Sequence, residues 1–265
     1  MIKFENTEVV GWEHAIRGMR NPLESWDKSD SFLGCDDNPC KECGFKPDWC
    51  GCNPVYTIGP NDYDLMKRLR NAGTDHRKFM RQIVVYVDIT APLYWWKEFD
   101  TYKVGTVANS CSTMHKIHDK EFKWEDFSNE HLTHTDIFHM DANEDAMNAL
   151  QVVINALNYN REKYLETKDK KYWWQMIQLL PSSYNQKRTV MLNYEVLANI
   201  YKSRKNHKLD EWSEHSDIDI NTLKRFYDGK YKLRNEKSLN DIGFCDWIKT
   251  LPYSELITGE EEGEK

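Results

Sequence analysis

The feature that most constrains the fold is an apolar run that leads directly into a concentrated aromatic segment. Residues 83–87 read IVVYV, a β-branched and aromatic run typical of a buried strand. Ala91-Pro92 follows, then a segment rich in Trp, Tyr and Phe up to Tyr102, then a small, polar run from Gly105 to Thr113. Buried hydroxyl and amide groups need hydrogen-bond partners. The stretch therefore predicts either a buried aromatic helix with a capped turn or a site for a flat, polar ligand.

Composition is that of a folded protein. Of the 265 residues, 40% are apolar and 13% aromatic, which argues against disorder. The net charge of −7 and the lack of a long basic run argue against nucleic-acid binding. No apolar stretch reaches the length of a membrane span, and the N-terminus lacks a signal pattern. We expect a cytoplasmic α+β domain over residues 1–258, followed by a disordered acidic tail over 259–265.

The segment 32–60 is rich in cysteine, glycine and proline and poor in apolar residues. Cys40 and Cys43 have the knuckle spacing of zinc sites, and thiolate ligands favour zinc or an iron–sulfur cluster. A segment that gains so little from burial would be stabilised by a metal. The alternative is a loop with free thiols. We expect a structural metal, zinc first, with ligands among Cys35, Cys40, Cys43, Cys50 and Cys52.

Apolar spacing predicts the other elements. A short strand near Ile2 and Phe4 precedes a helix that ends near Asn21-Pro22. Further helices are predicted over 61–79, with Gly73 as a stop, over 144–168, over 171–180 as a largely buried helix, and over 185–204. Residues 205–240 are expected to form helical hairpins and loops, and 244–257 a last packed segment. His131 and His134 have a spacing compatible with a metal pair, but their polar surroundings favour a solvated loop.

Two segments carry motifs in a recognisable order. Gly73 and His76 precede the strand, and Ala91-Pro92 and the aromatic run follow it. Downstream, Leu180-Pro181 precedes a polar set formed by Asn193, Glu195, Asn199 and Arg204. Together they resemble the flavin-dependent thymidylate synthases over roughly residues 1–31, 62–117 and 145–210. The resemblance implies an α+β fold with a central antiparallel sheet flanked by helices. The Cys-rich segment 32–60 is an insert, and residues 205–240 are an insertion that diverges from the family pattern; 32–60 and 215–240 have no counterpart in the family.

The family signature R-H-R-x-x-S-x-N-E-x-S-x-R is partly replaced. Thr101-Tyr102-Lys103 stand at its first triplet and Thr106 at its first serine. With one residue inserted, Asn109, Ser110 and Ser112 match the Asn, the Glu and the second serine. Arginines of the family pattern are replaced by Met114, Ile177 and Glu195. Because arginine binds phosphate through a planar fork of donors, other cations would take over that role here: Lys78, Lys97, Lys187 or Arg188.

The resemblance implies a FAD enzyme that reductively methylates dUMP or a related pyrimidine nucleotide, with methylenetetrahydrofolate as carbon donor and NADPH as reductant. It implies Arg204 as the catalytic residue, which helps to ionise the uracil ring. The residues implied for FAD are Lys78, Thr101, Tyr102, Lys103, Val104, Asn193, Glu195 and Asn199. Those implied for the nucleotide are Glu98, Asn109, Ser110 and Ser112. The family's sites form between subunits, so a homotetramer is expected.

Two other hypotheses stay open at this point. The lost arginines are compatible with a non-catalytic nucleotide-binding or regulatory relative that kept the fold. A zinc-knuckle interaction protein with an aromatic core would account for the cysteines, but not for the ordered motifs on both sides of the chain. A phage or bacterial source is expected for so divergent a relative.

Overall fold

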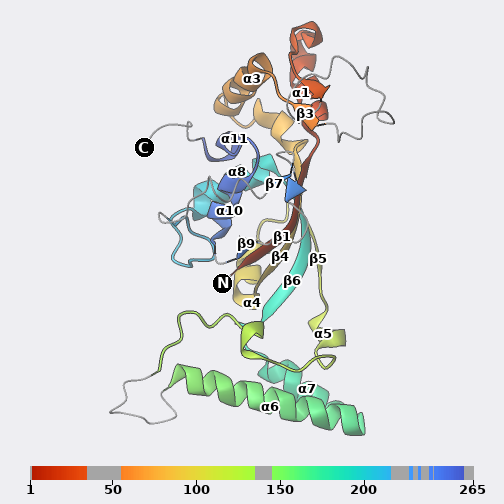
Figure 1. Ribbon diagram of the computed structural model, residues 1–265, viewed down its shortest axis with the longest axis vertical. Coiled ribbons are helices and arrows are strands. Elements are labelled where there is room, and N and C mark those ends of the chain that lie inside the picture. Colours follow the sequence, from red (N-terminus) through yellow and green to blue (C-terminus); the bar gives the residue numbers. More distant parts are fainter. Residues whose placement is uncertain are drawn as a thin grey trace.

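The structure is a computed structural model that describes residues 2–34, 55–134, 145–215, 227–228, 232–233, 239–240 and 242–259. Its centre is an antiparallel sheet whose strands follow the order β5-β6-β4-β1-β8-β7, with β9 also paired to β1 (Figure 1). The strands are β1 (Lys3–Val10), β4 (Val84–Pro92), β5 (Val107–Ser110), β6 (Asn185–Asn193), β7 (Tyr227–Asp228), β8 (Lys232–Leu233) and β9 (Leu239–Asn240).

Strand β4 occupies the middle of the sheet because one of its faces is almost wholly apolar. It pairs with β6 along its full length, from Val84 opposite Asn193 to Pro92 opposite Asn185. Alternate side chains point to opposite faces. Val85 is therefore completely buried, whereas the neighbouring Tyr86 is 43% exposed. The sheet thus has one buried face and one face open to solvent among the described residues.

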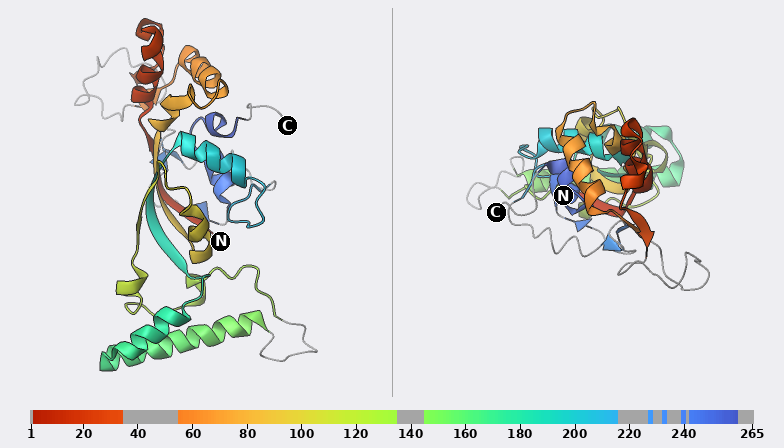
Figure 2. Two further views of the ribbon diagram at one scale, coloured as in Figure 1. Left: turned by 180° about the vertical axis from the view of Figure 1, so that it is seen from behind. Right: turned by 90° about the horizontal axis from the view of Figure 1, so that it is seen from above.

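Helices cover the buried face. α4 (Leu93–Phe99), α8 (Tyr194–Arg204), α10 (Phe244–Thr250) and α11 (Glu255–Thr258) lie together on one side of the sheet, and the view from behind in Figure 2 shows the same arrangement. Helices α1 (Trp12–Arg20) and α3 (Pro60–Asn71) lie beyond the upper end of the sheet in Figure 1. Aromatic rings fill the space between the layers: Trp95 stacks on Trp212 at 4.5 Å between ring centroids, and Phe4 stacks on Trp247 at 4.9 Å. The predicted α+β fold with a central antiparallel sheet is confirmed.

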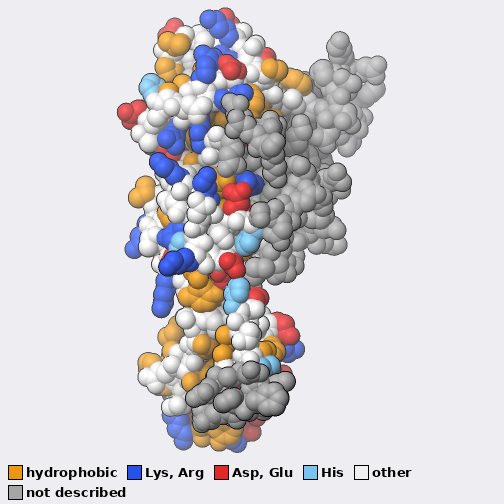
Figure 3. All heavy atoms as spheres, turned by 90° about the vertical axis from the view of Figure 1, so that its left-hand side faces the viewer, with side chains coloured by type: hydrophobic (Ala, Val, Ile, Leu, Met, Phe, Trp, Pro, Cys, Tyr) orange, Lys and Arg blue, Asp and Glu red, His pale blue; other side chains and the backbone are white. Residues whose placement is uncertain are grey.

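A helical hairpin lies at the far end of β5 and β6. It consists of α6 (Ala146–Thr167) and α7 (Lys170–Leu179), and the short helix α5 (Thr113–Lys116) lies nearby. Its own apolar cluster, which includes Phe122, Leu157 and Met176, is separate from the main core. Figure 3 shows this part set off from the rest of the molecule by a narrower waist. None of the described helices is long and apolar enough to cross a membrane.

Two expectations about local structure are wrong. Residues 185–204 form β6 followed by α8, not one helix; the break falls at Asn193, whose side chain caps α8 by accepting a bond from the Val196 amide. Helix α7 is not largely buried, because Trp174 is 45% exposed and Met176 alone among its described residues is buried. Within residues 205–240, where helical hairpins and loops were expected, residues 205–215 form turns and loop after the end of α8, and the described pairs 227–228, 232–233 and 239–240 are the strands β7, β8 and β9. The rest of that segment lies outside the described residues.

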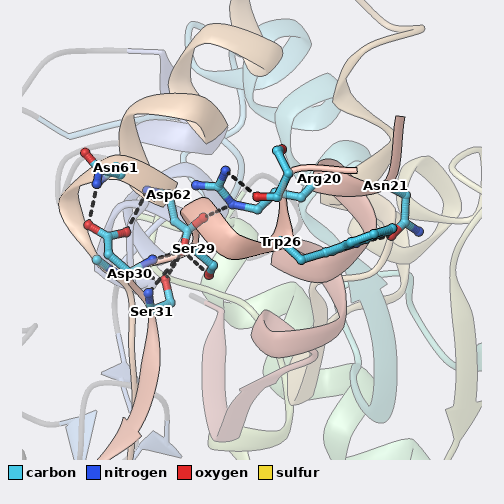
Figure 4. Close-up of polar contacts among 10 residues, drawn as sticks. Arg20, Asn21, Trp26, Ser29, Asp30, Ser31, Asn61 and Asp62 are labelled. Atoms are coloured by element: carbon cyan, nitrogen blue, oxygen red, sulfur yellow. Dashed lines mark hydrogen bonds and ion pairs between the residues drawn. The ribbon is translucent and has the colours of Figure 1, made fainter. Parts of the chain in front are cut away.

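A buried carboxylate ties the first helices to the two-stranded sheet of β2 (Phe32–Gly34) and β3 (Val55–Thr57). Asp62 is completely buried and accepts bonds from the Arg20 guanidinium at 2.6 Å and from both hydroxyls of Ser29 and Ser31 (Figure 4). In return, Asp30 accepts bonds from the backbone amides of Asn61 and Asp62 at the start of α3. This network holds α1, α3 and β2 in a fixed relation.

Candidate active site

Arg204 lies at the C-terminal end of α8, against the end of α4. Its Nε donates a 2.8 Å hydrogen bond to the Tyr102 hydroxyl, and its Nη1 lies 2.8 Å from Glu98 Oε2. The Nη1 group is not aligned for a hydrogen bond with Oε2, so this contact is an ion pair. The Arg204 side chain is 19% exposed and that of Glu98 is 35% exposed. The pair is therefore fixed in position and still open to solvent.

Aromatic packing fixes the guanidinium further. Arg204 lies over the Trp212 ring at 5.1 Å and over the Tyr102 ring at 5.7 Å, both within the range of cation–π attraction. Trp212 itself is completely buried. His207 Nε2 lies 3.5 Å from Glu98 Oε2, a contact that is an ion pair only when the histidine is protonated. Three of these residues match predicted site residues: Glu98, Tyr102 and Arg204 were predicted separately, and the fold brings them together.

His207 and Trp212 did not figure among the predicted site residues. Both belong to the segment 205–240, which diverges from the family pattern. The signal that could have found Trp212 is a tryptophan within the charged sequence KLDEWSEH, since a large apolar side chain in a polar stretch needs somewhere to pack. No local signal places His207 beside Glu98, because that contact depends on how α8 meets α4.

A second arginine lies at the other end of the same aromatic cluster. Arg188 on β6 stacks on Trp96 at 4.2 Å, and its Nη1 lies 2.7 Å from Asp100. Trp96 is packed edge-on against Trp95, which in turn stacks on Trp212. Arg188 is opposite Ser110 in the register of β5 and β6. Arg204 is therefore paired with Glu98 on α4, and Arg188 with Asp100, the residue directly after α4.

The predicted nucleotide-binding residues of β5 are divided between the two faces of the sheet. Successive side chains of a strand point in opposite directions. Ser110 therefore shares the helix-covered face with its partner Arg188, whereas Asn109 shares the open face with its partner Thr189. Ser112 accepts a 3.1 Å bond from the His115 amide and so caps α5. The structure does not bring Asn109 and Ser110 to one side of this chain.

The residues predicted to bind FAD fall into two groups. Thr101, Lys103 and Val104 are exposed beside Tyr102, and Val104 is 90% exposed. Asn193 and Glu195 stand at the other end of α8, about 14 Å from Arg204 at 1.5 Å per residue.

At that end, Arg81 in the 3₁₀ helix η3 (Arg77–Arg81) binds the buried carboxylate of Glu195, and this bond and the charge of Glu195 raise the pKa of Arg81. Asn199, in the middle of α8, and Lys78 are exposed. A ligand that touches both ends of α8 has to be extended.

The predicted metal ligands Cys35, Cys40, Cys43, Cys50 and Cys52 lie outside the described residues. Within the described part, no group of three or more His, Cys, Asp or Glu side chains could hold a metal ion. His131 pairs with Asp210 at 3.1 Å and His134 with Asp145 at 2.9 Å. These two histidines therefore have separate acidic partners.

No protein-family model matches the sequence, and no curated protein matches it. Solved structures do. Thymidylate synthase X from Helicobacter pylori, crystallised with FAD and dUMP, is 16% identical, with a TM-score of 0.51 over 78% of this chain and 86% of that chain. A second crystal structure of the flavin-dependent thymidylate synthase from Helicobacter pylori, complexed with FAD and dUMP, is 17% identical, with a TM-score of 0.50 over 77% of this chain and 85% of that one.

A UMP/dUMP methylase from Streptomyces cacaoi, bound with 5-Br UMP, is 10% identical, with a TM-score of 0.45 over 82% of this chain and 79% of that chain. The first two structures, with TM-scores of 0.51 and 0.50, establish the architecture. At such low sequence identities the similarity concerns the fold alone. The chain has the fold of the flavin-dependent thymidylate synthases, as the order of its motifs predicted.

Proposed function

We propose that this protein is a FAD-dependent enzyme that reductively methylates a pyrimidine nucleotide, dUMP or a close relative, with methylenetetrahydrofolate as carbon donor and NADPH as reductant. The observation that carries the proposal is the position of Arg204. In a fold shared with an enzyme crystallised with FAD and dUMP, Arg204 is held by Tyr102 and Glu98 at an open helix end.

Arg204 would act on the nucleotide ring. A fixed guanidinium stabilises negative charge that develops on a nearby group, and it does so without having to reorganise during the reaction. Tyr102 holds the Nε side of the guanidinium and Trp212 supports its plane, so the remaining N–H groups face a ligand in one orientation. Tyr102 and Trp212 therefore position the charge, while Arg204 makes the contact.

The exposed residues around Tyr102 suit a flavin dinucleotide. Lys103 offers a cation for a phosphate, Thr101 a hydroxyl, and Val104 an uncovered apolar side chain for a flat ring. Asn199 offers a carboxamide in the middle of α8. When bound, FAD would carry the reducing equivalents for the methyl group, which no amino-acid side chain can supply.

We also propose a homotetramer whose subunits share each site. Asn109 and Ser110 point to opposite faces of β5, so one ligand cannot contact both side chains of the same subunit. A ligand between two subunits could contact Asn109 of one and Ser110 of the other. The long hairpin of α6 and α7 exposes apolar side chains, among them Val152, Tyr159 and Trp174, that a neighbouring subunit would cover. Light scattering after size-exclusion chromatography tests the assembly.

The main test is a visible absorbance spectrum of the purified protein, with and without added FAD and then with a pyrimidine nucleotide. We expect a bound-flavin spectrum that shifts on addition of the nucleotide, and a methylated nucleotide on chromatography once NADPH and methylenetetrahydrofolate are present. Failure to bind flavin at high FAD concentration would refute the enzymatic proposal.

One observation favours a second candidate, a nucleotide-binding relative without activity. Glu195 stands where the family pattern has an arginine, and its carboxylate is buried against Arg81. That end of α8 therefore carries a neutralised pair in place of a free cation. Nucleotide binding without flavin binding or product formation would support this candidate.

A further inference from the structure

Two arginines lie at the junction of α3 and η3, away from the candidate active site. Arg70 is in the last turn of α3, and Arg77 is the first residue of η3. Between them the chain reverses at Gly73, whose φ is +110° and whose carbonyl accepts bonds from the amides of His76 and Arg77 at 3.1 and 3.2 Å. The reversal packs η3 against α3 and places the two guanidinium groups close enough to repel each other.

The end of α11 occupies one side of the Arg70 guanidinium. Nε donates to the Leu256 carbonyl at 3.1 Å, and Nη2 donates to the Ile257 carbonyl at 3.2 Å. Gly259 lies so close that a Cβ atom added there would be 2.3 Å from Nη2. Nη1 donates to Asn71 Oδ1 at 3.0 Å. All of these acceptors are neutral, and two of the five N–H groups of the guanidinium remain for a ligand.

Arg77 has fewer contacts. Its side chain is half-buried, and its guanidinium makes no hydrogen bond or ion pair with any described residue. Its Nε is fully enclosed, and a buried N–H group without an acceptor destabilises the folded state. Burial and the positive charge of Arg77 also lower the pKa of Arg70, as expected for neighbouring like charges that lack a counter-ion. An anion at the outer Nη groups would relieve this repulsion.

The acidic side chains of the neighbouring elements are engaged elsewhere. Three of them have their own partners: Asp62 with Arg20, Asp64 with Arg68, and Glu255 with Tyr63. Asp75, between the two arginines in the sequence, is exposed and acts on Arg81. In the described part of the molecule, Arg70 and Arg77 therefore carry two positive charges that no carboxylate balances.

We propose that Arg70 and Arg77 form a binding site for a phosphate group. A phosphate monoester carries a charge of about −1.5 to −2 at pH 7, which balances two arginines, whereas a carboxylate carries a single negative charge. The planar fork of a guanidinium matches two phosphate oxygens, so each arginine can bind one edge of the group. Inorganic phosphate and the phosphate of a nucleotide offer the same chemistry. The site goes beyond the proposed function, because neither arginine is assigned to FAD, to the pyrimidine nucleotide or to the methylation step.

Isothermal titration calorimetry of the full-length protein with sodium phosphate and with pyrophosphate, at constant ionic strength, tests the site. We expect both anions to bind wild type, and Arg77→Gln to weaken each at least about tenfold, because it removes a charge-assisted contact. Arg68→Gln is the matched control on α3. Its side chain is 69% exposed and paired with Asp64, so the affinities should change less than about twofold.

Thermal scans supply a readout that does not depend on a variant. Phosphate should raise the melting temperature of wild type above that in sodium chloride of equal ionic strength, because a ligand that binds only the folded state stabilises it. The same scans check that both variants fold.

A further titration identifies the source of the phosphate group. If phosphate still binds to protein saturated with FAD and dUMP, the site takes a free anion. If FAD or dUMP displaces phosphate and itself binds more weakly to Arg77→Gln, the site holds the phosphate of that ligand.

Absence of phosphate and pyrophosphate binding by wild type, or equal binding by wild type and Arg77→Gln, would overturn the inference. So would binding that appears only after removal of residues 260–265, since the glutamates of that segment would then be the natural partners of the pair. None of these outcomes changes the test of flavin binding, so the two proposals stand or fall separately.

Discussion

The buried carboxylate of Asp62 gives the sharpest test of how the N-terminal part of the fold is held. Its two oxygens face donors only: the Arg20 guanidinium, the hydroxyls of Ser29 and Ser31, and the backbone amides of Asp30 and Ser31. In Asp62→Asn, the new NH₂ group must face some of these donors whichever way the amide turns. Arg20, only 5% exposed, would also keep its charge without a counter-ion.

Removing one partner from a buried ion pair destabilises a protein by about 3–5 kcal/mol, because the remaining charge stays buried. We expect Asp62→Asn to lower the free energy of unfolding by that amount and the melting temperature by roughly 10 °C. Urea titration followed by circular dichroism measures the first quantity, and a thermal scan the second.

A matched control lies two residues further along α3. Asp64 has a side chain that is 62% exposed and pairs with Arg68 one turn away. Such surface pairs contribute no more than about 0.5 kcal/mol, so Asp64→Asn should barely change stability. If Asp62→Asn costs no more than Asp64→Asn, the network of Figure 4 does not stabilise the fold and the reasoning is wrong.

The same carboxylate predicts a pH dependence. Burial acts to raise the pKa of Asp62, but hydrogen bonds from Ser29, Ser31 and Arg20 outweigh it and hold that pKa below its ordinary value. A carboxyl with a depressed folded pKa stabilises the protein above its unfolded pKa, about 3.9, and this stability is lost as pH falls through the folded value. The gap in unfolding free energy between wild type and Asp62→Asn should be constant from pH 7 to about 5 and narrow below about pH 4. A gap that widens on acidification would contradict the assignment.

Three further predictions concern the site and its support. Arg204→Ala should reduce turnover at least about a hundredfold with a melting temperature near that of wild type, because it removes a charge that acts on the ring; unchanged turnover would remove Arg204 from the mechanism. Trp212→Ala should cost about 3–5 kcal/mol in urea titrations, since the ring is completely buried, and a cost below about 1 kcal/mol would show that the site collapses around the gap. Cys40→Ser with Cys43→Ser should abolish zinc on elemental analysis and lower the melting temperature, and wild-type protein without metal would end the knuckle hypothesis.

Some elements could be predicted because their pattern is local. The apolar run at 83–87 and the helix predicted at 144–168 match β4 and α6 closely, and both have a period that neighbouring residues alone reveal. The prediction of one helix over residues 185–204 was wrong because the structure of this stretch is not set by a local pattern. The strand NQKRTVMLN alternates between Gln186, Val190 and Leu192 on one face, yet charged residues interrupt it and a true helix follows without a glycine or proline between them. Pairing with both β4 and β5 decides that this stretch is extended.

The candidate site also has features that the sequence predicts and features that only the folded structure shows. The sequence by itself determined which residue types are present and their order along the chain: an Ala-Pro after a strand, an aromatic segment, and an arginine eleven residues after Asn193. Only the tertiary structure decided that Glu98 meets Arg204, that Arg20 meets Asp62, and that Asn109 and Ser110 part to opposite faces. Hydrophobic periodicity reports which face of an element is buried, but not which other element buries it. Contacts between residues so far apart in the chain therefore appear only once the sheet and its helices have packed.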